Sequence, residues 1–138
     1  MTLHAYTDGA SRGNPGESGI GILLKDEGGN VVHTARGYIG RATNNIAEYT
    51  ALIACLTWAR KNGCRRLIVH SDSELMVRQL HGTYRVKDKD LQVKFQKVKE
   101  LLKDAPFAFS IEHITREMNA DADRLANEGI EAKQPLEV

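Results

Sequence analysis

The 138-residue sequence has no excess of charge of either sign and few cysteines. Nineteen Lys and Arg residues against eighteen Asp and Glu residues give a formal net charge of +1, which neither indicates nor excludes a polyanionic partner. Cys55 and Cys64 form no CxxC pair and belong to no cysteine–histidine cluster. This pattern favours two free thiols in a reducing compartment over a disulfide.

Long apolar runs are also missing. None approaches the roughly 20 residues that a membrane-spanning helix needs, and the start, MTLHAYTDG, lacks the charged-then-apolar pattern of a secretion signal. We therefore expect a soluble, cytoplasmic protein with no membrane partner, and a monomer because no apolar surface stripe is evident. No repeat or linker divides the chain, so we expect a single domain over residues 1–133 and a flexible tail over residues 134–138.

Apolar spacing and turn signals predict an α/β order of elements. Three strands are expected at the amino end, over residues 3–7, 19–25 and 31–39, because turn-forming residues separate them. A helix with an asparagine cap follows and ends at Gly63. The remaining elements are a strand over 65–72, helices over 73–82 and 88–105, a strand over 107–114, and a helix from about residue 119. This order predicts a five-stranded mixed sheet, with three antiparallel amino-terminal strands plus parallel strands, flanked by helices.

Four acidic residues stand where the sheet and the core are expected. Asp8 closes the first predicted strand, and Asp72 ends LIVHSD, the most apolar strand. Glu48 shares a helix face with Leu52, which should pack on the sheet, so the pattern points a carboxylate inward. Asp123 lies at the border of the buried stripe of the last helix. The two strand-end aspartates should meet at one edge of a parallel sheet.

Taken singly, these residues have a plainer interpretation as turn or cap residues, or as a charge that suits a helix start, although Glu48 fits it worst. Taken together they indicate a metal site. A buried carboxylate is costly unless it is paired or metal-bound, and neighbouring carboxylates raise each other's pKa values. A hard divalent cation removes both costs, and oxygen ligands without cysteine or histidine favour Mg²⁺ or Mn²⁺ over Zn²⁺.

Four motifs make the sequence similar to type 1 ribonucleases H, which cut RNA paired with DNA. They are YTDGASRGNPG, TNNIAEYTAL, VHSDSELMV and NADADRLAN, within a resemblance that spans residues 3 to about 130. The resemblance implies a ribonuclease H-like fold. It implies a catalytic and metal-binding set of Asp8, Glu48, Asp72 and Asp123. Asp123 is preferred to Asp121 because the family's aspartate precedes one residue and then Leu-Ala. It also implies two Mg²⁺ ions per site, for which Mn²⁺ can substitute, and products with 5′-phosphate and 3′-hydroxyl ends.

The same resemblance implies contacts to the RNA/DNA hybrid. The glycine-rich stretch after Asp8 would let the backbone approach a minor groove, and Thr43 with Asn45 would seat a phosphate of the DNA strand. Asn44 has the alternative role of a plain helix cap, and Glu74 stands where many relatives have glutamine. The candidate substrate-binding residues are Gly9, Ser11, Arg12, Asn14, Thr43, Asn44, Asn45, Glu74, Tyr84 and Lys87.

Two further features depart from the family pattern. The segment GTYRVKDKD joins two helices directly, where some relatives insert a basic helix. We therefore expect weaker affinity for the hybrid, with salt-sensitive contacts at Arg12, Tyr84 and Lys87. No histidine follows His113, which lies in a predicted strand. The loop ITREMNADAD thus lacks the histidine of many relatives, and its possible substitutes are Arg116 and Glu117.

Other functions remain open at this point. A relative that cleaves double-stranded RNA would carry the same motifs. A module that binds hybrids without turnover would not need all four carboxylates. A transposase or integrase relative would match fewer motifs and carry longer insertions. The sequence therefore favours an endonuclease that removes RNA from RNA/DNA hybrids.

Overall fold

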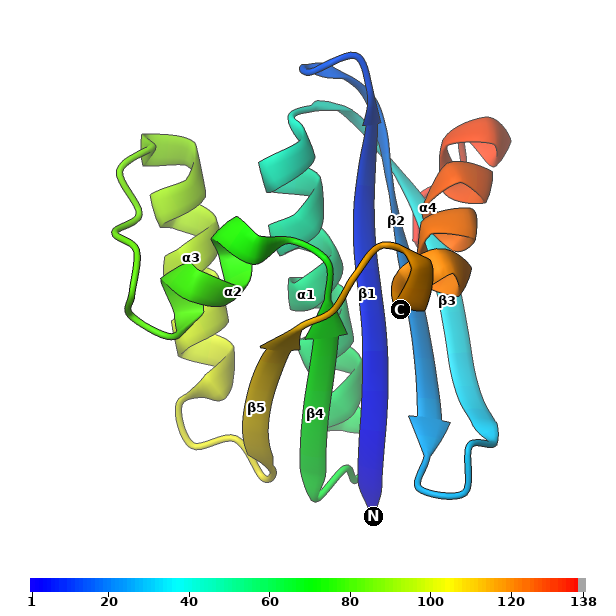
Figure 1. Cartoon of the computed structure of the whole chain (residues 1–138), viewed down its shortest axis with the longest axis vertical. Coiled ribbons are helices and arrows are strands. Elements are labelled where there is room, and N and C mark those ends of the chain that lie inside the picture. The colour runs from blue at the N-terminus through cyan, green and yellow to red at the C-terminus, as the bar shows by residue number, and fades with distance from the viewer. Residues whose placement is uncertain (137–138) are drawn as a thin grey trace.

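The computed structural model describes residues 1–136, and its centre is one five-stranded mixed sheet in the order β3-β2-β1-β4-β5 (Figure 1). The strands are β1 (Thr2–Arg12), β2 (Gly16–Asp26), β3 (Val31–Ala42), β4 (Arg66–Ser71) and β5 (Ala108–His113). β2 pairs antiparallel with β1 and β3, whereas β4 pairs parallel with β1 and β5. The predicted fold class is confirmed.

Helices cover both faces of the sheet (Figure 1). They are α1 (Asn44–Lys61), α2 (Glu74–Leu80), α3 (Lys89–Leu102) and α4 (Ala120–Ala132), with a short 3₁₀ helix, η1 (Glu117–Asn119), before α4. α1 lies on one face and is backed by α3, and α4 lies on the other face over β2 and β3. Residues 81–88 join α2 to α3 without a further helix, as the sequence predicted.

The hydrophobic core lies between the sheet and α1. Leu3 of β1 and Leu67 of β4 are fully buried there, together with Leu52 and Leu56 of α1. Burying a leucine side chain contributes about 1.5–3 kcal/mol, so this layer holds α1 firmly on the central strands. The helix face that includes Glu48 is therefore fixed relative to β1.

The first strand is longer than the sequence predicted, and Asp8 lies within it rather than at its end. Residues from Gly9 to Arg12 continue the antiparallel ladder with β2, where Arg12 pairs with Glu17. Pairing with a neighbouring strand outweighs the weak strand preference of small residues. The true turn is short, and Gly13 supplies its positive φ of 91°.

The structure corrects the predicted cap of α1 and shows a packing role of Gly9 that the sequence did not indicate. The cap of α1 is Thr43, whose side chain accepts a hydrogen bond from the Ile46 N–H at 3.2 Å, and not an asparagine. Gly9 serves helix packing, because a Cβ there would lie 2.2 Å from the Ala47 carbonyl carbon. The backbone of α1 can therefore approach β1 directly, and this approach brings Glu48 beside the strand.

The residues after α4 lie along the edge strand β3. The Tyr38 N–H donates to the Gln134 carbonyl at 2.8 Å, and Leu136 lies close to Gly37. The described part of the predicted flexible tail thus has defined contacts, and residues 137–138 lie outside the described residues. No helix among residues 1–136 is long and apolar enough to cross a membrane.

The packing at Gly9 gives a testable prediction. We expect Gly9→Ala to lower the free energy of unfolding by about 3 kcal/mol, the upper end for an overpacked core, because the new methyl group meets helix backbone. Urea unfolding would measure the change. Gly28→Ala is the matched control, since its Cβ would come no closer than 3.3 Å to any atom. Equal stability of the two variants would contradict this account of Gly9.

Candidate active site

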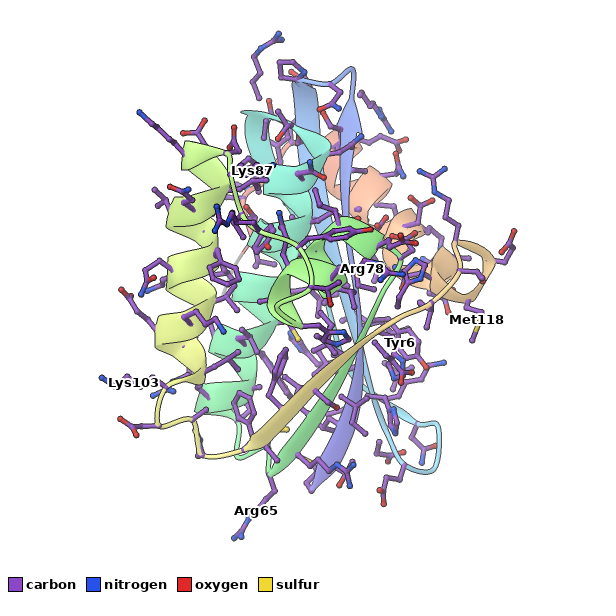
Figure 2. All side chains as sticks on the ribbon, turned by 60° about the vertical axis from the view of Figure 1, so that its left-hand side comes forward. Tyr6, Arg65, Arg78, Lys87, Lys103 and Met118 are labelled. Atoms are coloured by element: carbon purple, nitrogen blue, oxygen red, sulfur yellow. The ribbon has the colours of Figure 1, made fainter. Side chains whose placement is uncertain are left out.

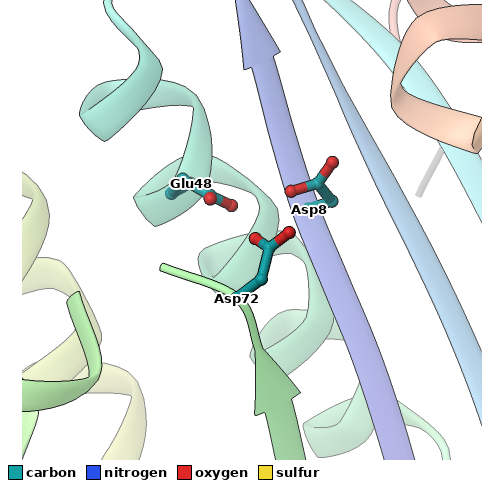
Figure 3. Close-up of side chains that lie close together, drawn as sticks. All are labelled: Asp8, Glu48 and Asp72. Atoms are coloured by element: carbon teal, nitrogen blue, oxygen red, sulfur yellow. The ribbon is translucent and has the colours of Figure 1, made fainter. Parts of the chain in front are cut away.

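Three carboxylates from separate elements meet beside the carboxyl end of β4, an inner strand of the sheet. Asp8, Glu48 and Asp72 each offer an oxygen, and these oxygens all lie within 4.8 Å of one another. Figure 3 shows the three side chains pointing toward one another from β1, α1 and the residue after β4. The sequence predicted this meeting, although it placed Asp8 at a strand end.

Backbone geometry holds this cluster in place. The parallel pairing of β1 with β4 sets Thr7 opposite Ser71. The residues that follow this pair, Asp8 in β1 and Asp72 after β4, therefore lie beside each other. Glu48 is held from the helix side, where its Oε1 accepts a hydrogen bond of 2.7 Å from the Gly9 N–H. The strand register therefore positions Asp8 and Asp72, and the hydrogen bond from Gly9 positions Glu48 beside them.

Burial makes the cluster electrostatically costly. Asp8 is 4% exposed and Glu48 is 8% exposed. Burial, and then the nearby Glu48, raise the pKa of Asp8 to about 10. Burial, and then Asp72, raise the pKa of Glu48 to about 8, against the opposing hydrogen bond from Gly9. Bringing several anions out of water at short range favours either a bound proton or a bound cation.

The fourth predicted carboxylate, Asp123, approaches from the other side of the sheet. It lies in the first turn of α4, is exposed, and contributes to the raised pKa of Asp8. The helix comes close because β2 has Gly21 opposite Asp8, where a Cβ would lie 2.2 Å from the Ala122 carbonyl oxygen. Asp123 is thus beside the cluster rather than inside it.

A cleft of about 660 Å³ opens over the carboxylates. It brings together many of the predicted site residues, and Ser73 at the cap of α2 is a lining residue that sequence analysis missed. Its serine-then-helix pattern was the available signal. The predicted residues that line the cleft are Asp8, Gly9, Ser11, Asn44, Asn45, Glu48, Asp72, Glu74, Arg116, Glu117 and Asp123. The other lining residues are Ala10, Ser73, Leu75 and Ala120.

Five predicted substrate contacts lie outside this cleft. Arg12 is ion-paired with Glu131 at 3.0 Å, and Thr43 caps α1. Asn14 accepts a hydrogen bond from the Asn44 N–H at 3.1 Å, so it ties the β1–β2 turn to the start of α1. The other two are Tyr84, which lies under the Arg78 guanidinium, and Lys87, which is exposed in the loop before α3 (Figure 2).

The donor chemistry of the cluster fits a hard divalent cation. Only carboxylate oxygens converge there, and the described residues contribute no cysteine or histidine to the group. Oxygen donors suit Mg²⁺, Mn²⁺ or Ca²⁺ better than Zn²⁺. Because Asp8 and Glu48 are buried, a bound positive charge would offset the cost of removing their carboxylates from water.

A family model and a known protein both match nearly the whole chain. A family model described as reverse transcriptase-like matches residues 6–129. The chain is 44% identical over 129 residues to ribonuclease HI of Halobacterium salinarum, which covers 94% of this chain. It spans 64% of the length of that relative.

Solved structures match over nearly their whole length. The crystal structure of RNase H1 from Halobacterium salinarum has a TM-score of 0.90 and 43% identity, over 96% of this chain and 99% of that one. The structure of LC11-RNase H1 in complex with an RNA/DNA hybrid has a TM-score of 0.88 and 43% identity, over 94% and 97% of the two chains.

The raised pKa values predict how stability depends on pH without metal. The folded protein keeps a proton on Asp8 that the unfolded chain releases above its ordinary pKa of 3.8. The contribution of the cluster to the free energy of unfolding should therefore be largest below about pH 4 and should fall as the pH rises toward the folded pKa values. Urea unfolding in EDTA at several pH values would measure this decline.

Two variants isolate the contribution of the cluster. In Asp8→Asn the decline should be smaller, because the variant has no carboxyl to titrate at the position whose pKa is raised the most. Asp121→Asn removes an exposed carboxylate outside the cluster and should keep the decline of the wild type. An equal decline in all three proteins would show that the cluster does not govern it.

Proposed function

Because the chain belongs to the type 1 ribonuclease H family, we propose that it is an endonuclease that hydrolyses the RNA strand of RNA/DNA hybrids, leaving 5′-phosphate and 3′-hydroxyl ends. The observation that carries this proposal is the convergence of Asp8, Glu48 and Asp72 oxygens within 4.8 Å, at the floor of a cleft. The similarity to ribonuclease HI, and to an RNase H1 structure in complex with an RNA/DNA hybrid, supports the same reaction.

The carboxylates would hold two Mg²⁺ ions, for which Mn²⁺ can substitute. Asp8 is the carboxylate that interacts with all three others, Glu48, Asp72 and Asp123, so it would suit a ligand shared by both ions. When bound, the ions would supply the positive charge that activates water and stabilises the leaving 3′ oxygen. The Gly9 N–H would keep Glu48 aimed at the site throughout.

The walls of the cleft suit a polyanionic duplex. The amino terminus of α1 presents the side chains of Asn44 and Asn45, and the positive end of the helix dipole favours a phosphate there. Arg116 adds a positive charge to the lining of the cleft. These groups contact backbone and 2′-hydroxyls rather than base sequence, which fits recognition by shape.

Residues outside the cleft would contact the duplex farther from the cut bond. Lys87 and Tyr84 extend from the loop between α2 and α3, and both are exposed. Arg12 would have to release its ion pair with Glu131 to bind a phosphate. Exposed ion pairs contribute only about 0–1 kcal/mol, so this exchange is energetically easy.

We expect the protein to act as a monomer in the cytoplasm. Its exposed large apolar side chains come from separate elements, among them Val31 of β3, Val93 of α3 and Met118 of η1. Cys55 and Cys64 are buried free thiols, which suits a reducing compartment.

Duplex cleavage is the direct test of the function. Matched end-labelled RNA/DNA, RNA/RNA and DNA/DNA duplexes would be incubated with Mg²⁺, with Mn²⁺ and with EDTA. We expect cutting of only the RNA strand of the hybrid, lost in EDTA because the carboxylates then have no cation. Cutting of RNA/RNA would widen the substrate class. Binding of the hybrid without cleavage in either metal would instead indicate a binding module.

Carboxylate variants test the residues behind the reaction. Asp8→Asn, Glu48→Gln and Asp72→Asn should each lower kcat on the order of 10³-fold, the loss expected when charge stabilisation worth several kcal/mol is removed. Their melting temperatures without metal should stay the same or rise, because repulsion inside the cluster is relieved.

The last helix offers a matched pair for the fourth carboxylate. Asp121 and Asp123 lie two residues apart in the first turn of α4. Asp121 pairs with Arg124 at 3.6 Å and does not line the cleft, whereas Asp123 does. Asp123→Asn should lower kcat strongly, and Asp121→Asn should leave it within about twofold, since exposed pairs contribute little. Equal activity of the two variants would remove Asp123 from the site.

A further inference from the structure

Asn119 uses its side chain in an unusual way for its position. It directly precedes α4, where an asparagine ordinarily caps its own helix, yet it makes no side-chain cap hydrogen bond. Instead its Nδ2 donates to the Thr7 carbonyl oxygen at 2.9 Å, in a buried contact between residues 112 positions apart. Asn119 is only 1% exposed. Its amide therefore joins the start of α4 to β1.

The Thr7 carbonyl lies where the parallel ladder stops. The pairing of β1 with β4 ends at Thr7 and Ser71, because the chain then turns through Asp72 into α2. β1 continues to Arg12 and pairs only with β2 over that stretch. The Asn119 amide donates a hydrogen bond to this carbonyl, and a buried carbonyl without a hydrogen bond would be costly. The contact is thus adjacent to Asp8.

A second contact fixes the same turn of α4. Gly21 of β2 stands opposite Asp8, and its missing side chain lets the Ala122 carbonyl approach the strand. Asn119 and Ala122 are both in contact with the sheet, and Asp123 follows directly. The Asn119 N–H also donates to the Arg116 carbonyl at 3.0 Å, which ties the cleft-lining loop to this anchor.

We propose that Asn119 is a positioning residue for the fourth carboxylate: by holding the start of α4 on the Thr7 carbonyl, it keeps Asp123 beside Asp8 for metal binding. This inference rests on the proposed function. Asn119 acts through its donor alone, because its Oδ1 has no hydrogen-bond partner among the described residues. Asn119 is buried and is not among the residues that line the cleft, so its removal should weaken metal binding and leave hybrid binding largely unchanged.

Metal titration without substrate is the primary test. Mg²⁺ would be titrated into ¹⁵N-labelled wild type, Asn119→Ala, Asp123→Asn and the double variant, with binding followed by NMR shifts of the Gly9 amide. We expect Asn119→Ala to weaken Mg²⁺ binding by about 10-fold. The double variant should bind Mg²⁺ no more weakly than Asp123→Asn alone, because residues that act through one another are not additive. Wild-type affinity in Asn119→Ala, or additive losses, would overturn the proposal.

A matched variant separates positioning from general loss of packing. Ile130→Val trims a residue that is 1% exposed near the other end of α4, and it should lower the melting temperature without changing Mg²⁺ affinity. Equal loss of Mg²⁺ affinity in Ile130→Val and Asn119→Ala would mean that helix packing, and not the Asn119 amide, is responsible.

Kinetics then connect the effect to the reaction. In Asn119→Ala the Mg²⁺ concentration for half-maximal cleavage should rise by the same factor as the binding constant, while KM for the hybrid changes less than about twofold. A raised KM with an unchanged Mg²⁺ requirement would contradict the proposal. If the wild type binds Mg²⁺ but cleaves no hybrid, the proposed function fails, and the NMR comparison still decides the role of Asn119.

Folding of the variants must be checked first. Asn119→Asp, which keeps the shape but replaces the donor by an acceptor, is the second variant if Asn119→Ala does not fold. It should show the same weakened Mg²⁺ binding. If neither variant has the circular dichroism of the wild type, Asn119 is required for the fold itself and the positioning proposal is overturned.

Discussion

Mutual repulsion among desolvated carboxylates is the constraint on which the rest of this structure depends. Asp8, Glu48 and Asp72 would separate in water, yet the fold holds their oxygens within 4.8 Å of one another. The stabilisation that keeps them there comes from elsewhere, from the apolar layer between α1 and the central strands. The same repulsion, which the core sustains without metal, would favour the binding of a cation between the carboxylates.

The site depends on close approach of backbone from both faces of the sheet. Gly9 admits the backbone of α1 on one face, and Gly21, the partner of Asp8 in the β1–β2 ladder, admits the backbone of α4 on the other. Neither contact leaves space for a methyl group. Asp8 thus lies between α1 and α4, whose backbones are both packed directly against the sheet. This packing restricts the movement of Glu48 and Asp123 relative to Asp8.

Positive charge around the cleft is sparse, which has consequences for substrate binding. Arg116 lines the cleft, whereas Arg12 is engaged with Glu131, and Glu74 adds a negative charge to the wall, paired with Arg78 at 3.2 Å. The loop over residues 81–88 carries no additional helix. Affinity for a duplex would therefore come largely from the metal-bound site and from helix termini, with the lysines of α3 acting at longer range.

The sequence by itself determined the element order, the sheet class and the identity of the clustered carboxylates, because apolar periodicity and local turn signals report on burial. Glu48 could be found because a charge interrupts an apolar helix face. Tertiary structure alone decided that β1 runs past Asp8, that Thr43 caps α1, and that Gly9 serves helix packing. It also decided that Asn119 binds the Thr7 carbonyl instead of capping α4. The course of β1, the packing of Gly9 and the contact of Asn119 depend on partners far away in the chain, which local sequence preferences do not report. The Thr43 cap is local, since its partner Ile46 is three residues away, but the adjacent asparagines offered competing helix starts.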